Sequence, residues 1–323
     1  MGERAVAEAS ASTRNEMRPR DLIGYGGRPP DIVWPNGARV AVSLVVNFEE
    51  GAELAIGDGD DRNERIAEVA SVVEAGTRDF AQEEMFAYGM RAGLWRFLDA
   101  FERHRAKATF FMCGRAVERS PRLAAEVVAR GHEPACHGWL WRPHADFLDA
   151  AEERMSLLRC IEVTRAVTGE RPLGFFCRGS QSPHTRELLA ELGFLYDSNG
   201  LDDDLPYFAA AGAKRMLVVP YSLDCNDMKF FHPNGFVEPD QFVRYIRAAL
   251  STLLDEAERG RGGVLNIGFH LRICGRPARF AAVKGILEAL DQLGDRVWVA
   301  RRVDLARHWL ARGGPEGHSR ETR

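Results

Sequence analysis

Short apolar runs alternate along the chain with longer stretches in which apolar residues recur at helical spacing. The runs are continuous and rich in Val, Ile and Phe, which is typical of strands buried on both faces of a parallel sheet. We expect strands in eight of them: 41–48, 107–114, 132–138, 172–178, 194–199, 216–224, 263–271 and 296–301.

The stretches between these runs carry helix start and stop signals. In one of them Ser120 is the expected N-cap, Pro121 occupies the first helical position and Gly131 ends the helix. Repeated strand–helix units predict a parallel sheet, and seven or eight such units predict an open or irregular (β/α) barrel of the α/β class. The other predicted helices run from about Asp146 to Thr168, over 182–193, from Pro239 onward, around 280–290 and up to about Leu310.

Three segments fall outside this alternation. Residues 51–88 are charged and follow the first strand directly, so we expect a lid or an oligomer contact there. Residues 1–17 are small and polar, which predicts a disordered leader, and residues 313–323 are expected to form a flexible tail. Because no low-complexity linker interrupts residues 18–312, we expect them to form a single domain.

The composition narrows the class of partner. Apolar residues make up 45% of the 323 residues and charged residues 28%, which suits a globular protein with a large core. A net charge of −4 offers no basic surface for nucleic acid or an anionic membrane, so we expect neither as a partner. The first 21 residues contain no apolar signal-peptide core, and no apolar stretch approaches the ~18 residues of a membrane span. We therefore expect a cytoplasmic protein.

The cysteines show neither a CxxC pair nor a short regular spacing, and several lie inside apolar runs. We expect buried free thiols rather than disulfides. Their positions are Cys113, Cys136, Cys160, Cys177, Cys225 and Cys274.

Polar side chains gather where the predicted strands end. The carboxyl ends of parallel strands converge on one face of a barrel, and that face carries the active site. We therefore expect a pocket for a small molecule, lined from six strands. The candidates are Glu49, Glu50, His137, Arg178, Asp197, Asn199, Asp224, Asn226 and His270.

Each candidate also has a structural interpretation. The Glu49–Glu50 pair could end a strand in solvent, whereas a buried carboxylate would have a raised pKa that suits a general base near neutral pH. His137 and His270 could be core histidines with satisfied hydrogen bonds. Arg178 could form a structural salt bridge with any strand-end acid.

The histidine spacing bears on whether the site holds a metal. Mononuclear hydrolytic zinc sites usually combine two histidines with one carboxylate and leave a position open for water. The residue four positions after His137 is Trp141, and His144 could reach the site only if its loop folds back. We therefore expect no cofactor. If zinc is present, Glu50 and His137 are its expected ligands.

Several sequence motifs of this chain resemble those of a known family. They span Arg20 to Trp309 and resemble the polysaccharide deacetylase (NodB-homology) superfamily, most closely its cofactor-independent allantoinase branch. The resemblance implies that superfamily's deformed (β/α) barrel, for which we expect about seven parallel strands, and a homo-oligomer. The matching segments are "RDLIGYGGRPPDIVWP", "NFEEGAE", "YGMRAGLWR", "GHEPACHGWLW", "YDSNGLDDDLPYF", "VVPYSLDCNDMKF", "GFHLRICGRPAR" and "VWVARRVDLARHW".

The resemblance also implies roles for individual residues. Glu49 and Glu50 would supply the catalytic base and its partner, in an order that stays open, and His270 would be the general acid. Arg272 and Arg276 would contact a carbonyl or ureide group. Trp141 stands where the deacetylases have their second metal-binding histidine, and His137 stands at the first.

These roles predict a hydrolase that opens a cyclic amide at a non-peptide C–N bond, such as allantoin to allantoate in purine catabolism. One glutamate would remove a proton from water, Arg178 or a backbone N–H would stabilise the oxyanion, and His270 would protonate the leaving nitrogen. Asp197, Asn199, Asn226 and Trp141 would line the substrate pocket.

The segment "FFCRGSQS" departs from the third motif of the allantoinase branch and shifts Arg178, so the exact substrate stays open. Three other functions stay open with it: a metal-dependent N-deacetylase of an amino sugar or peptidoglycan, a hydrolase of another cyclic imide, and a pseudoenzyme that binds a small ligand.

Overall fold

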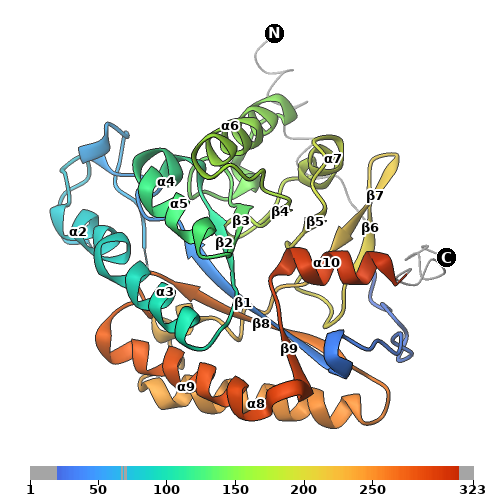
Figure 1. Cartoon of the computed structure of the whole chain (residues 1–323). Helices are drawn as coiled ribbons and strands as arrows, with labels where there is room; N and C mark the ends of the chain where they lie inside the picture. Colours follow the sequence, from blue (N-terminus) through green and yellow to red (C-terminus); the bar gives the residue numbers. More distant parts are fainter. Residues whose placement is uncertain (1–19, 67, 69–70, 313–323) are drawn as a thin grey trace.

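The strand β1 (Val40–Phe48) forms the centre of the sheet (Figure 1). In the computed structural model, which describes residues 20–66, 68 and 71–312, every residue of this strand is buried. β8 (Gly263–His270) pairs with it in parallel from Val40 to Asn47, while β2 (Thr109–Met112) pairs with its second half and β9 (Val297–Val299) with its first. Burial on both faces explains why its sequence is a continuous apolar run.

From β2 the sheet continues through shorter strands to an antiparallel hairpin. The order is β6-β7-β5-β4-β3-β2-β1-β8, with β9 beside β1, and only the β6–β7 pairing among the described strands is antiparallel. A bridge between Asn226 and Gly268 links the segment after β7 to β8, so the sheet curls into a half-barrel (Figure 1). The remaining strands are β3 (Glu133–Cys136), β4 (Gly174–Phe175), β5 (Tyr196–Asp197), β6 (Tyr207–Ala211) and β7 (Lys214–Val218).

The predicted α/β class with a deformed (β/α) barrel is confirmed. Eight of the nine described strands pair in parallel, close to the seven expected. The prediction missed β6, because "YFAAA" lacks the β-branched run of the other strands and only Gly212, with a φ of 60°, marks the hairpin turn. The predicted strand 216–224 was wrong in its second half, since β7 ends at Val218.

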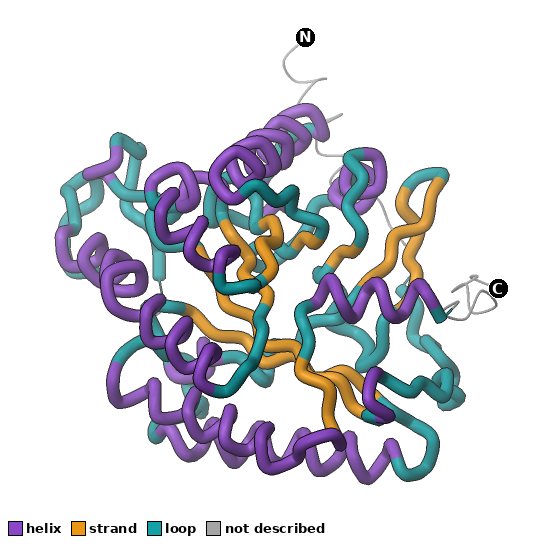
Figure 2. Tube along the Cα trace, in the orientation of Figure 1, coloured by secondary structure: helices purple, strands orange, loops and turns teal. Residues whose placement is uncertain are grey.

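Helices surround the curled sheet, as Figure 2 shows. A π-helical turn, Gly89–Gly93, joins α2 to α3, and α8 and α9 pack side by side below the sheet in Figure 1. A large apolar core lies between β1, β2 and β8 and the helices α3, α8 and α9. The helices are α2 (Phe80–Tyr88), α3 (Leu94–Arg103), α4 (Gly114–Arg119), α5 (Pro121–Ala129), α6 (Ala150–Thr168), α7 (Thr185–Glu191), α8 (Pro239–Ala257), α9 (Pro277–Leu293) and α10 (Arg302–Ala311).

The predicted start of α5 is confirmed, whereas that of α6 is wrong. Ser120 is the N-cap of α5 and Pro121 its first residue, although the Ser120 side chain makes no capping hydrogen bond, because the unpredicted helix α4 runs directly into it. α6 begins at Ala150 rather than near Asp146, since Asp149 Oδ1 accepts a hydrogen bond from the backbone N–H of Glu152 at 2.8 Å and caps the helix.

Other predictions concern the chain as a whole. All six cysteines are buried and free, as expected. Of the helices that the structure describes, none is both long and apolar enough to cross a membrane. The predicted leader 1–17 and tail 313–323 lie outside the described residues.

Candidate active site

Four strand-end residues meet at the carboxyl edge of the sheet. Glu49 and Glu50 follow β1, His137 follows β3, and His270 is the last residue of β8. Glu49 lies between the two imidazoles: its Oε2 is 3.5 Å from His137 Nε2 and its Oε1 is 3.6 Å from His270 Nε2. All four side chains are buried, so the structure excludes the solvent-exposed interpretation of the glutamate pair.

Arg272, from the turn after β8, binds both glutamates. Its Nη1 donates a hydrogen bond to Glu49 Oε1, and its backbone N–H donates to Glu50 Oε1 at 3.0 Å. The rings of Phe86 and Trp141 lie 4.5 and 4.8 Å from the guanidinium carbon, at distances typical of cation–π contacts. A buried, oriented positive charge therefore lies beside two carboxyl groups.

The two glutamates differ in charge because their surroundings differ. Burial alone would raise the pKa of Glu49, but Arg272, His270 and His137 hold that pKa far below its ordinary value. For Glu50, burial raises the pKa to about 7, with Arg272 opposing the rise and the charge of Glu49 adding to it. Glu49 is therefore ionised at neutral pH, whereas Glu50 exchanges its proton there.

Asp227 fixes the orientation of His270. Its Oδ1 lies 2.7 Å from His270 Nδ1, and its Oδ2 accepts from the backbone N–H groups of His270 and Cys274 at 2.8 and 3.2 Å. Burial would lower the pKa of His270, but Glu49 and Asp227 raise it above the ordinary value. His270 is thus held with Nε2 toward Glu49, and the two carboxylates stabilise its protonated form.

Sequence reasoning missed Asp227. The signal was present in "LDCND", where Asp224 and Asn226 were noted, but spacing in an irregular turn does not show which side chain faces inward. Asp224 instead accepts a hydrogen bond from Tyr245 at the surface.

Arg178 lies outside the cluster of glutamates and histidines. Its guanidinium donates to Glu64 Oε1 at 2.9 Å and to the Trp141 carbonyl at 3.2 Å, and it stacks 3.7 Å from the centre of the Trp141 ring. Arg178 therefore contacts Trp141 and not the carboxylates of this cluster. The arginine beside those carboxylates, where we expected an oxyanion donor, is Arg272.

Four other predicted substrate contacts are engaged in structural networks. Asp197 is buried, pairs with Arg186 at 2.8 Å and accepts from Asn199 Nδ2 at 2.6 Å. Asn226 donates to Tyr221 at 2.9 Å, and the guanidinium of Arg276 stacks 3.7 Å from the ring centre of Tyr88. Among the described residues, no hydrogen bond or ion pair joins these four side chains directly to the cluster of glutamates and histidines.

The segment 51–88 contributes to the site through Glu68, which sequence reasoning also missed. Glu68 Oε1 lies 2.9 Å from Arg272 Nε and 2.8 Å from Nη2, while Glu64 of the same segment binds Arg178. Of the two predicted roles for this segment, the structure supports a covering of the site, and the oligomer contact stays a prediction.

The charges around the cluster bear on whether it could hold the zinc ion considered above. Among residues 20–66, 68 and 71–312, no cluster of three or more His, Cys, Asp or Glu side chains could hold a metal. A cation on the expected ligands Glu50 and His137 would also meet the guanidinium of Arg272, whose Nη1 lies 3.7 Å from Glu50 Oε1, and like charges repel. His144 does not return to the cluster, because it pairs with Glu153 at 2.8 Å.

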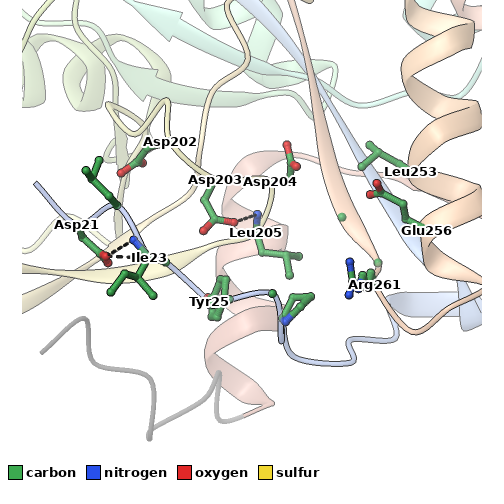
Figure 3. Close-up of a pocket in the computed structure, with 17 residues that line it drawn as sticks. Asp21, Ile23, Tyr25, Asp202, Asp203, Asp204, Leu205, Leu253, Glu256 and Arg261 are labelled. Atoms are coloured by element: carbon green, nitrogen blue, oxygen red, sulfur yellow. Dashed lines mark hydrogen bonds between the residues drawn. The ribbon is translucent and has the colours of Figure 1, made fainter.

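A separate cavity of about 420 Å³ lies at the opposite end of β8 (Figure 3). It is bordered by Gly263, the first residue of that strand, and by Tyr25, Asp203, Asp204 and Arg261. None of the predicted site residues lines it, so it is distinct from the cluster at His270.

A curled, mostly parallel sheet with carboxylates, imidazoles and a buried arginine at its strand ends defines a hydrolase of the NodB-homology class. The chain belongs to the polysaccharide deacetylase family. The sequence model of that family, "Polysaccharide deacetylase", matches residues 84–196. A Schizosaccharomyces pombe protein named "Putative polysaccharide deacetylase" is 32% identical over 312 residues, which cover 91% of this chain and 97% of that protein.

Two solved structures are similar over most of the chain. A "probable Polysaccharide deacetylase" from Pseudomonas aeruginosa shares 42% identity with a TM-score of 0.85, covering 92% of this chain and 99% of that one. The structure of "Puue Allantoinase" shares 41% identity with a TM-score of 0.86, at the same coverage of both chains. The similarity therefore extends to relatives named for two different reactions.

Proposed function

We propose that this protein hydrolyses the amide C–N bond of a small cyclic ureide or imide, with the opening of allantoin to allantoate as the first candidate. The contact of the Arg272 guanidinium with Glu49 carries the proposal, because it supplies a fixed cation where a carbonyl would be polarised. The likeness to Puue Allantoinase over 92% of this chain supports the same class of substrate.

Glu49 is the better placed of the two glutamates to activate water. Its Oε2 has no hydrogen-bond partner among the described residues, whereas Glu50 accepts backbone N–H groups on both oxygens, at 3.0 and 3.3 Å. A general base must hydrogen-bond the proton that it removes. In the proposed reaction Glu49 takes a proton from water as the water oxygen attacks the ring carbonyl.

The remaining groups stabilise the charge and complete the proton transfers. Arg272 donates to the carbonyl oxygen as it becomes negative. When the C–N bond breaks, His270 Nε2 gives its proton to the ring nitrogen. The former carbonyl carbon becomes the carboxylic acid of the open-chain product, and this acid ionises in water. Asp227 holds His270 in this orientation.

Metal-dependent N-deacetylation of an amino sugar is the second candidate, which the names of two relatives favour. It would require zinc, and the charge of Arg272 beside Glu49 disfavours that ion. The predicted cytoplasmic location, homo-oligomer and place in purine catabolism stay predictions.

A substrate panel tests the proposal. The purified protein is incubated with allantoin, hydantoin, dihydrouracil, succinimide and an N-acetylglucosamine oligomer, and ring opening and acetate release are both measured. Ring opening without acetate release supports the proposal. Acetate release without ring opening would establish the deacetylase function instead.

A further inference from the structure

Three buried polar atoms around Arg272 have no hydrogen-bond partner among the residues that the structure describes. They are Glu49 Oε2, Glu68 Oε2 and Arg272 Nη2, on side chains exposed by 0, 2 and 1%. Buried polar atoms are rarely left without a partner, because each loses its bonds to water. Their gathering at one arginine indicates a site for a ligand that offers both a donor and an acceptor.

Glu68 and Arg272 present a donor and an acceptor side by side. Glu68 Oε1 accepts from Arg272 Nε at 2.9 Å and lies 2.8 Å from Nη2, although the Nη2 contact lacks the geometry of a hydrogen bond. Oε2 of the same carboxylate is then available as an acceptor next to Nη2. The rings of Phe86 and Trp141 flank the guanidinium and restrict its orientation.

We propose that Glu68 is a substrate-recognition residue, which accepts the N–H of the cleaved amide while Arg272 Nη2 donates to its carbonyl. This inference rests on the proposed function and deepens it. A small ring holds its amide in the cis form, so that the C=O and N–H lie on one edge and meet the two side chains together. An acyclic acetamide is trans and points the two groups in opposite directions. The pair thereby selects cyclic amides over the acetamido group of a sugar.

A comparison of two substrates tests this pairing. Hydantoin and its methyl derivative, substituted on the nitrogen of the cleaved bond, are hydrolysed by wild type and by Glu68→Ala. A hydrogen bond to a carboxylate is worth about 10- to 100-fold, so wild type should favour hydantoin in kcat/KM by at least about tenfold. In Glu68→Ala that preference should fall to within about twofold, as in a double-mutant cycle.

Three variants serve as controls for this experiment. Glu68→Gln keeps an acceptor and should retain most of the preference, while Glu68→Met fills the space without an acceptor and replaces the Ala variant if that one does not fold. Glu64→Ala removes another carboxylate of the same segment, one that binds Arg178 and not Arg272. This variant should keep the wild-type preference for hydantoin.

The outcomes separate this inference from the function on which it rests. Ring opening by wild type with an unchanged preference in Glu68→Ala or Glu68→Met would overturn the role of Glu68 and leave the proposed function standing. Failure of wild type to open any ring, with acetate released from the sugar oligomer, would overturn both.

Discussion

At the scale of single residues, two adjacent glutamates in the same cluster carry different charges. The strand end places Glu49 against Arg272 and between two imidazoles, whereas Glu50 is equally buried but bound mainly by backbone N–H groups. Burial raises the pKa of Glu50 to about 7, while the neighbouring positive groups keep the pKa of Glu49 well below its usual range. An ionised carboxylate, the proposed base, therefore lies beside a carboxyl group that titrates near neutral pH.

This difference predicts the pH dependence of ring opening. Below about pH 7 Glu50 is protonated and leaves Arg272 with less negative charge beside it, so Glu49 is a weaker base. We expect kcat/KM to rise through about pH 7 and to fall again above the raised pKa of His270. Glu50→Gln should remove the rising limb, and Glu49→Gln should lower kcat/KM about 10²- to 10⁴-fold at every pH. The reverse pattern would identify Glu50 as the base.

Removing the Asp227 carboxylate should change the falling limb of the same plot of kcat/KM against pH. Because Asp227 raises the pKa of His270, Asp227→Asn should lower that pKa and shift the falling limb to lower pH. We expect kcat/KM to fall about 10²- to 10³-fold, within the range of positioned acid–base groups. Asp224→Asn, which affects the contacts of Asp224 with Tyr245 and the Cys225 thiol, is the matched control. An unshifted limb in Asp227→Asn would contradict the role given to this pair.

At the scale of elements, the glycines of a π-helical turn allow α2 and α3 to approach the site. A Cβ at Gly89 would lie 2.5 Å from Glu50 Oε1, and one at Gly93 would lie 2.2 Å from the carbonyl oxygen of Leu271. Both contacts are closer than atoms tolerate, so the turn depends on these glycines. π-helical turns occur often at functional sites, where they offset one part of a helix from the next.

Gly89→Ala should therefore damage the site. The added methyl group displaces the Glu50 carboxyl, and we expect kcat/KM to fall at least about tenfold with a stability loss of about 1–3 kcal/mol from overpacking. Gly285→Ala on α9 is a matched control, because its Cβ would lie 2.9 Å from a methyl group of Val243 on α8, in the contact between these two helices. Equal activity losses in the two variants would indicate a general packing effect instead.

The sequence allowed the strand ends to be predicted but not the turns between them. Glu49, Glu50, His137 and His270 sit at the ends of apolar runs, and parallel pairing is enough to bring such ends together. Asp227 and Glu68 lie in irregular segments, where no periodicity relates position to direction. Arg178 ends its run as predicted, but Glu64 and Trp141 turn its guanidinium away from the carboxylates.

At the scale of the whole molecule, a buried arginine joins the two ends of the curled sheet. Arg302, the first residue of α10, donates to Asn266 on β8 at 2.7 Å, to Ser198 after β5 at 3.0 Å, and to the carbonyls of Val219 and Pro220 after β7. Its side chain is fully buried. Like the bridge from Asn226 to Gly268, these bonds connect β8 with the segment after β7.

Removing this charge should destabilise the half-barrel. Arg302→Met leaves several buried acceptors without a donor, each costing about 1–3 kcal/mol, and we expect a loss of at least about 3 kcal/mol in the free energy of unfolding. Urea denaturation measures it, with the exposed Arg307→Met as a control expected within about 0.5 kcal/mol of wild type. A loss below about 1 kcal/mol in Arg302→Met would show that the curl is held by apolar packing alone.

We propose that a buried arginine, rather than a metal ion, supplies the positive charge at the carboxylates. The most direct measurement is kcat/KM for allantoin with protein that has been treated with a strong chelator and assayed with and without added zinc. We expect equal values, within about twofold, in the two assays. Loss of ring opening after chelation, restored by zinc, would contradict it.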